Sequence, residues 1–230
     1  MKPHETWDVL PHGELERVAD NLYTVVGKLP MPLGETPRRM TIVKLRGGRL
    51  AIYSAIALDE PRMNALLRLG RPTFLIVPSA IHRIDAHPWK ERFPDLVVVA
   101  PRGALDKIRE VVAVDATACD LDDPRVRLEM VAGTDDRELA MLVDRTLVVN
   151  DLIFNLPRVK GLAGLGLRLL GFGPGHPAMP KLVQRRLVTD RGRMRGQLRA
   201  WAAMGLERIL PAHGGAIDNP RETLLKLAGA

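Results

Sequence analysis

Three residues that can bind a metal ion lie within six positions of one another. His82, Asp85 and His87 follow an apolar run at residues 74–77, which Pro78 ends because proline cannot donate a hydrogen bond to a sheet ladder. The pattern predicts a buried strand and then a loop that carries histidine and carboxylate side chains. Zinc and similar divalent ions use these side chains as ligands in catalytic sites.

Two later segments have the same design, an apolar run that ends in a polar residue. Residues 146–149 precede Asn150 and Asp151, and residues 209–212 precede His213. In layered α/β folds, side chains from distant parts of the chain converge at strand ends. A catalytic metal site needs about three such ligands and an open position for water. The sequence contains no motif of fixed spacing such as His-Glu-x-x-His, so this prediction depends on position alone.

Each of these candidates also has a purely structural interpretation. Asp151 could bond the amides of the following loop, and His82 could be a loop histidine bonded to a carbonyl. Asp85 could cap a helix that starts at His87. His176 lies in a loop rich in glycine and proline, where it could supply a further ligand or simply be part of a surface loop.

The first half of the chain must supply the strand and loop around His82. Residues 7–10 and 22–26 read as strands, and the Gly47-Gly48 pair predicts a hairpin between strands at 40–45 and 49–53. The proline-rich segment 30–37 reads as a surface loop. From Asp59 a helix is predicted, followed by strands at 73–77 and 96–99 that alternate with helices.

The second half repeats this order. Strands are predicted at 126–131, 138–143 and 146–149, with a tight turn at Asp144-Arg145. Met194, Leu198 and Trp201 fall on one face of a helix, and the last strand, at 208–211, precedes a helix that starts at Asn219-Pro220. Two similar halves of strands followed by βα units suggest an αββα sandwich in a single domain, residues 1–230.

Composition narrows the function classes. The net charge is +7, but 34 Lys and Arg are interleaved with 27 Asp and Glu, and aromatic residues are only 4% of the chain. We therefore expect no nucleic-acid partner, and we interpret the densest basic region, 181–199, as a solvated helix face.

The longest weakly polar run, 161–173, is interrupted by Arg168 and is too short to cross a membrane. The single cysteine, Cys119, excludes an intramolecular disulfide, and the N-terminus lacks the apolar core of a signal peptide. A cytoplasmic protein without a membrane partner is expected.

The order of these elements resembles the metallo-β-lactamase-fold superfamily over nearly the whole chain. The similarity rests on a strand with a histidine loop, the strand end Thr-Leu-Val-Val-Asn-Asp151, the segment Ile-Leu-Pro-Ala-His213-Gly214, and the opening at residues 20–25. The resemblance implies an α/β fold, the αββα sandwich, in which two mixed β-sheets pack face to face with helices on the outside.

The sequence departs from the superfamily at the first loop. The signature His-x-His-x-Asp-His is replaced by the segment 79–87, and a further histidine is absent near Gly133-Thr134. The sequence therefore looks like a subgroup with a degenerate metal-binding motif. Asp151 matches the family's bridging aspartate and His213 matches its final histidine.

Two functions remain open on these grounds. The first is a metal-dependent hydrolase with one metal ion, bound by His82, His87, Asp151 and His213, in which Asp85 and Asp151 act as catalytic residues. A metal-bound hydroxide would attack an ester, an amide or a similar bond. Zinc is expected before iron or manganese. The second is a metal-free, non-catalytic member that binds a small molecule or a protein partner. The sequence gives no oligomeric state.

Overall fold

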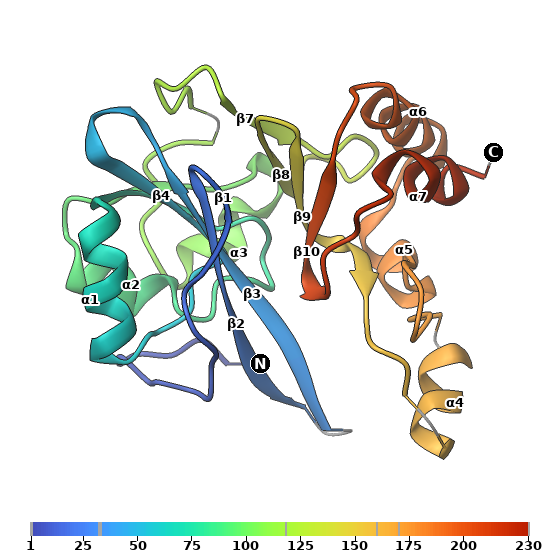
Figure 1. Cartoon of the computed structure of the whole chain (residues 1–230), viewed down its shortest axis with the longest axis horizontal. Coiled ribbons are helices and arrows are strands. Elements are labelled where there is room, and N and C mark those ends of the chain that lie inside the picture. The colour runs from blue at the N-terminus through green and yellow to red at the C-terminus, as the bar shows by residue number, and fades with distance from the viewer. Residues whose placement is uncertain (1, 32–33, 118, 160, 170, 230) are drawn as a thin grey trace. The chain divides into compact units, whose positions relative to one another are not determined.

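The computed structural model describes residues 2–31, 34–117, 119–159, 161–169 and 171–229 (Figure 1). The chain divides into two compact units, Met1–Leu128 and Glu129–Ala230. Each unit is built around one mixed β-sheet. The division leaves the single domain over residues 1–230 as a prediction.

The first unit contains a six-stranded sheet whose strands follow the chain order from β1 to β6. The pairs from β1 to β4 are antiparallel, and β4, β5 and β6 are parallel. The elements are β1 (Glu16–Ala19), β2 (Leu22–Met31), β3 (Gly34–Lys44), η1 (Arg46–Gly48), β4 (Arg49–Tyr53), α1 (Glu60–Leu69), β5 (Arg71–Ile76), α2 (Ala86–Arg92), β6 (Val97–Val99), η2 (Arg102–Ala104) and α3 (Leu105–Arg109).

Local sequence signals explain several of these boundaries. Gly47 and Gly48 have φ values of 71° and 69°, so they make the predicted turn between β3 and β4 in a conformation that glycine adopts without strain. The Asp59 side chain accepts a hydrogen bond from the Arg62 amide at 3.0 Å and caps α1, as the sequence predicts. Trp89 is fully buried in an apolar core that α1, α2 and the sheet share.

Two expectations for this unit were wrong. The segment 30–37 is not a loop, because Pro30 pairs with Glu35 and Lys28 with Pro37 in a long β2–β3 hairpin. The fixed φ of proline fits an extended backbone, and each proline removes only one donor from the ladder. Residues 32 and 33 lie outside the described part. Residues 7–10 form no strand, since Trp7 instead packs against Trp89 at 5.5 Å and covers the core.

The second unit contains a four-stranded sheet in the order β10-β9-β8-β7. Strands β9 and β10 are parallel, and β8 and β9 are antiparallel. The elements are β7 (Val126–Met130), which begins just before this unit, β8 (Leu139–Val143), β9 (Thr146–Asn155), α4 (Gly161–Leu169), α5 (Lys181–Leu187), α6 (Arg191–Ala202), β10 (Arg208–Gly214) and α7 (Pro220–Leu227).

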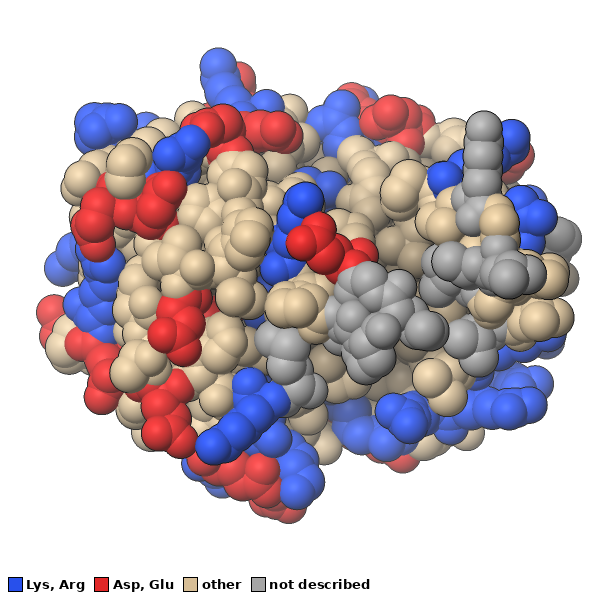
Figure 2. Space-filling model, turned by 90° about the horizontal axis from the view of Figure 1, so that it is seen from below, with Lys and Arg blue, Asp and Glu red and all other residues tan. Residues whose placement is uncertain are grey.

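The predicted strands and helices of this unit are present, but β9 continues six residues beyond its predicted end at 149, to Asn155. Asp144, with a φ of 48°, makes the turn between β8 and β9. Met194, Leu198, Trp201 and Ala202 form the buried face of α6 and join the core between this helix, α7 and the sheet. None of the described helices is both long enough and apolar enough to span a membrane. On the face shown in Figure 2, acidic and basic side chains are interspersed over much of the surface.

Candidate metal centre

A distortion of β9 positions Asp151. Pro211 of β10 pairs with Val149, but His213 pairs with Phe154, so four residues of β9 lie opposite one residue of β10. Extra residues of this kind form a bulge, which bends a strand and redirects its side chains. The carboxylate of Asp151, which lies in the bulge, is 3.2 Å from Nε2 of His213, and both side chains are buried. The structure therefore brings these two predicted ligands together within the second unit.

Two features constrain His213, one at its ring and one at the backbone that follows it. The Phe154 ring stacks on it with a centroid distance of 4.6 Å and an interplanar angle of 16°. The next residue, Gly214, has a φ of 104°, and a Cβ atom at this position would collide with the carbonyl oxygen of Asn155. Only glycine fits at this position, because the backbone after His213 approaches β9 closely and has a positive φ.

A fully buried acid, Glu138, supports the bulge. Its Oε1 atom accepts a hydrogen bond from the Leu152 amide at 3.2 Å, and the amides of Asn150 and Asp151 also interact with this carboxyl group. Burial raises the pKa of Glu138 well above its usual value, and the negative charge of Asp151 raises it further. Both effects favour the neutral form of Glu138.

In the first unit, His82 is buried and fixed by a serine. Its Nδ1 atom is 2.7 Å from Oγ of Ser54, and both side chains are buried. Ser54 follows β4 and has a φ of 56°, a conformation that costs energy for any residue with a Cβ atom. Strain of this kind is found at sites where a side chain must be held in one place. The contact at Nδ1 makes Nε2 the nitrogen with which His82 would bind a metal.

Asp85 has a different environment from the other candidates. One of its carboxylate oxygens pairs with the Arg38 guanidinium, and the other lies 2.8 Å from Nδ1 of His4. Asp85 and Arg38 are almost fully buried. Asp85 precedes α2, but its side chain makes no capping hydrogen bond there. Its carboxylate is therefore engaged with a fixed positive charge, and its catalytic role stays a prediction.

The two remaining histidine candidates lie on more exposed surfaces. His87 is in the first turn of α2, 39% exposed, and its Nε2 atom lies 3.4 Å from the carboxylate of Glu91 one turn later. His176 is exposed and lines a pocket of the second unit with residues from α5, α6 and α7. A ligand role for His87 stays a prediction.

Sequence reasoning missed Glu138, Arg38 and His4. Glu138 had a signal, since it is a carboxylate at the start of an otherwise apolar strand. Arg38 had none, because it lies between the segment predicted as a loop, 30–37, and the strand predicted at 40–45. His4 lies near the N-terminus, and no local pattern shows its contact with Asp85, 81 positions away.

Comparison with known proteins supports the fold from structure alone. No family model and no curated relative matches the chain. The crystal structure of the DIM-1 metallo-β-lactamase matches with a TM-score of 0.66 and 13% identity, over 96% of this chain and 98% of that one. A metallo-β-lactamase from Hirschia baltica gives 0.64 and 11%, over 95% and 97%. The mono-zinc form of FIM-1 from Pseudomonas aeruginosa gives 0.61 and 12%, over 96% of both chains. The chain therefore has the metallo-β-lactamase fold, as the resemblance of its sequence predicted, with a sequence that has diverged far from these enzymes.

Proposed function

We propose that this protein is a metal-dependent hydrolase with a single metal ion, held in the second unit by Asp151 and His213. The observation that carries the proposal is the pair formed by Asp151 and His213, a buried carboxylate oxygen and an imidazole nitrogen 3.2 Å apart. A catalytic metal needs a further protein ligand, and His82 is the candidate that the sequence offers for it. The mono-zinc form of FIM-1, which has the same fold, supports a site with one metal ion.

The chemistry of these donors fits a divalent metal. Two imidazoles and one carboxylate are a common ligand set for catalytic zinc, which keeps a fourth position open for water. Burial of Glu138 favours its neutral form, which reduces the negative charge that lies next to the ligand Asp151. Zinc is the first choice, and iron is the second, because imidazole and carboxylate suit both ions. The ion, when bound, supplies the Lewis acidity that activates water for attack on an ester or amide.

The other residues of the site hold the ligands in place. Phe154 stacks on the His213 ring, and the close approach of the backbone at Gly214 to β9 fixes the chain just after this histidine. Ser54 fixes His82 through Nδ1, a contact that in metal sites sets the ring orientation. Glu138 binds the amides of the β9 bulge and so sets the position of Asp151. We assign Asp85 a positioning role, in which its ion pair with Arg38 anchors the loop that carries His82.

Elemental analysis tests the proposal directly. Protein purified without a metal-affinity column should contain about one equivalent of zinc, iron or manganese, and a chelator should remove it and lower the melting temperature. Asp151→Asn and His213→Ala should each abolish the bound metal. His176→Ala is the matched control, an exposed histidine of the same unit, and should retain the metal. Metal well below one equivalent that added zinc or iron does not restore would refute the proposal.

A second function is favoured by one specific observation. Two of the groups that would bind a metal already satisfy each other, because the Asp151 carboxylate lies within hydrogen-bond distance of His213. This is the arrangement expected of a metal-free, non-catalytic member, in which buried polar groups must find partners in the protein. Under this alternative, a chelator leaves the melting temperature unchanged and Asp151→Asn remains stable. The same elemental analysis therefore distinguishes the two functions.

A further inference from the structure

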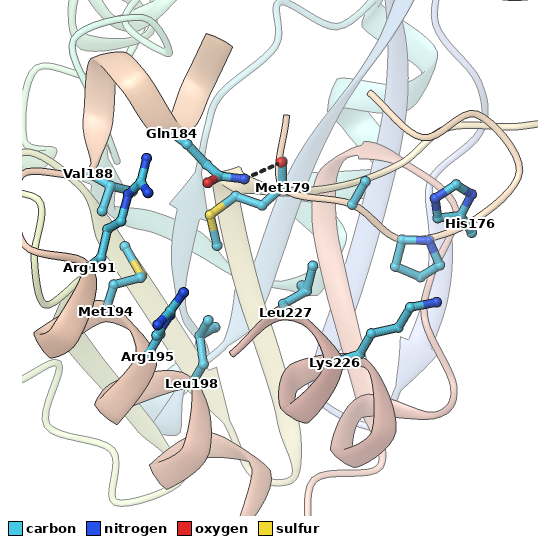
Figure 3. Close-up of a pocket in the computed structure, with 12 residues that line it drawn as sticks. His176, Met179, Gln184, Val188, Arg191, Met194, Arg195, Leu198, Lys226 and Leu227 are labelled. Carbon is cyan, nitrogen blue, oxygen red and sulfur yellow. Dashed lines mark hydrogen bonds between the residues drawn. The ribbon is translucent and has the colours of Figure 1, made fainter. Parts of the chain in front are cut away.

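A pocket in the second unit offers chemistry that the proposed metal site does not use. Its volume is about 330 Å³, and its walls come from residues 176–179 and from α5, α6 and α7 (Figure 3). This volume lies at the lower end of the range of about 300–1,000 Å³ that is typical of small-molecule sites. The pocket is therefore large enough for a small organic ligand.

The interior of the pocket is apolar. Met194 and Leu198 belong to the buried face of α6, and Met179, Val188 and Leu227 pack beside them as half-buried residues. Figure 3 shows Met179 and Leu227 between Arg191 and Arg195 on one side and Lys226 on the other, with Leu198 beside Arg195. Unbranched methionine side chains adapt to ligands of varied shape. A ligand that fills this space needs a flexible apolar part.

The rim of the pocket is cationic. Arg191 and Arg195 lie one turn apart on α6, and Lys226 lies on α7. All three residues are exposed, and none of the twelve residues that line the pocket is acidic. Like charges one turn apart on a helix destabilise each other unless a counter-charge is present.

The protein supplies no such counter-charge among its described residues. Arg191, Arg195 and Lys226 form no ion pair with any described carboxylate. The nearest acid in sequence, Asp190, accepts a hydrogen bond from the Arg193 amide at 2.9 Å and caps α6. Between positions 158 and 199 the sequence has ten Lys and Arg residues but only one acid, Asp190. An anionic group of a bound ligand would balance this charge.

We propose that this pocket binds a small amphiphile with a flexible apolar chain and a terminal carboxylate or phosphate, such as a medium-chain fatty acid. The chain occupies the space between Met179, Leu198 and Leu227. The anionic end lies at Arg191 and Arg195, whose guanidinium groups bind carboxylate and phosphate through paired hydrogen bonds. Lys226 adds a third positive charge from α7.

This site is separate from the proposed metal centre but shares a wall with it. The Ala178 amide donates to the Phe154 carbonyl at 2.9 Å, and the Phe154 amide donates to the Ala178 carbonyl at 2.8 Å. The Phe154 ring in turn stacks on His213. The test must therefore show that binding of an amphiphile does not depend on the metal ligands.

Calorimetric titration with decanoate, below its micelle-forming concentration, tests the proposal. We expect one binding site per chain, and a loss of affinity of at least about tenfold in Arg191→Gln/Arg195→Gln. The matched control is Arg193→Gln/Arg199→Gln, which removes the same charge from the same helix at positions that do not line the pocket and should bind as the wild type does. Decyl phosphate should bind as well as decanoate, whereas uncharged decanol should bind at least about tenfold more weakly. Each methylene removed from the chain should weaken binding about fourfold.

Two further experiments distinguish binding in this pocket from binding at the metal centre or at a lipid-binding surface. Asp151→Asn should bind decanoate with unchanged affinity whether or not the protein binds metal, so the two proposals fail independently. Equal affinity for decanol and decanoate, or unchanged binding by Arg191→Gln/Arg195→Gln, would overturn the proposal. So would binding to vesicles of acidic phospholipid without binding to free decanoate, because the cationic residues would then act as a lipid-binding surface and not as a pocket.

Discussion

Two buried aspartates of this protein have opposite environments. Asp85 in the first unit pairs with the guanidinium of Arg38 and also contacts His4, whereas Asp151 in the second unit contacts His213 and lies beside Glu138, whose neutral form is favoured. A guanidinium keeps its charge at any physiological pH, so it already balances the charge of Asp85. An imidazole can be neutral, so Asp151 can present a negative charge to a cation. The residue that pairs with each aspartate, arginine for Asp85 and histidine for Asp151, thus determines which of the two carboxylates is suited to bind a metal ion.

The largest effect on stability is expected when Asp85 in the first unit loses the positive charge of Arg38. Arg38→Ala should lower the free energy of unfolding by about 3–5 kcal/mol, because it leaves the buried Asp85 carboxylate without its positive partner and removes the hydrogen bond to the Ala55 carbonyl. Urea denaturation at neutral pH measures this change. Arg17→Ala is the control, since Arg17 forms an exposed ion pair with Asp20 and should cost less than about 1 kcal/mol. Equal effects of the two variants would show that the Asp85 pair is not important for stability.

Asp123, a second acid of the first unit, also pairs with an arginine, and its contribution to stability depends on pH. The hydrogen bonds that the Arg125 side chain donates hold the pKa of Asp123 well below its usual range, helped by the amides of Arg125 and Arg46. Asp123→Asn should lower the free energy of unfolding by about 2 kcal/mol at neutral pH.

The sign of the pH dependence follows from the lowered pKa. The folded state binds the proton of Asp123 less readily than the unfolded chain does, so the carboxylate stabilises the fold above the usual aspartate pKa of about 4. This stabilisation is lost as the pH falls toward the lower pKa of the folded state. Denaturation of wild type and Asp123→Asn between neutral and acid pH should therefore show a difference that shrinks below about pH 4. Asp95→Asn, at an exposed position, should give no such trend.

The serine that holds His82 should have a smaller effect on stability but a measurable effect on the metal. Ser54→Ala removes the 2.7 Å contact with Nδ1 of His82 and should cost about 1 kcal/mol of stability. Loss of such a supporting contact typically weakens metal binding by about 10–100-fold, which competition with a chromophoric chelator can measure. Ser79→Ala is the matched control, because Ser79 is a buried serine of the same loop region whose hydroxyl accepts from the Ile81 amide. The same metal affinity in both variants would exclude His82 as a ligand held by Ser54.

The contrast between the two aspartates also explains what the sequence could predict. Hydrophobic periodicity and turn residues predicted most strands and helices. Asp151 and His213 were correctly expected to be neighbours, but Asp151 lies in a bulge within β9 and not at the end of a strand. The bulge in β9 and the buried Glu138 beneath it were not predicted, since one charged residue at a strand start does not reveal its burial. The partners of Asp85 depend on contacts 47 and 81 positions apart, which no local pattern encodes.

At acid pH, the smallest effect on stability is expected for Glu138→Gln in protein freed of metal by a chelator. Glutamine has the shape of a neutral glutamic acid, so below about pH 4 the variant and the wild type should differ by less than about 1 kcal/mol. Because the pKa of Glu138 is raised in the folded state, the folded protein binds this proton more tightly than the unfolded chain does. The wild type therefore loses stability as the pH rises above the usual glutamate pKa, whereas Glu138→Gln does not, and the variant should become relatively more stable toward neutral pH. Parallel stability curves for the two proteins from acid to neutral pH would mean that Glu138 is ionised beside Asp151, and the site would then carry two negative charges where the comparison with Asp85 assigns it one.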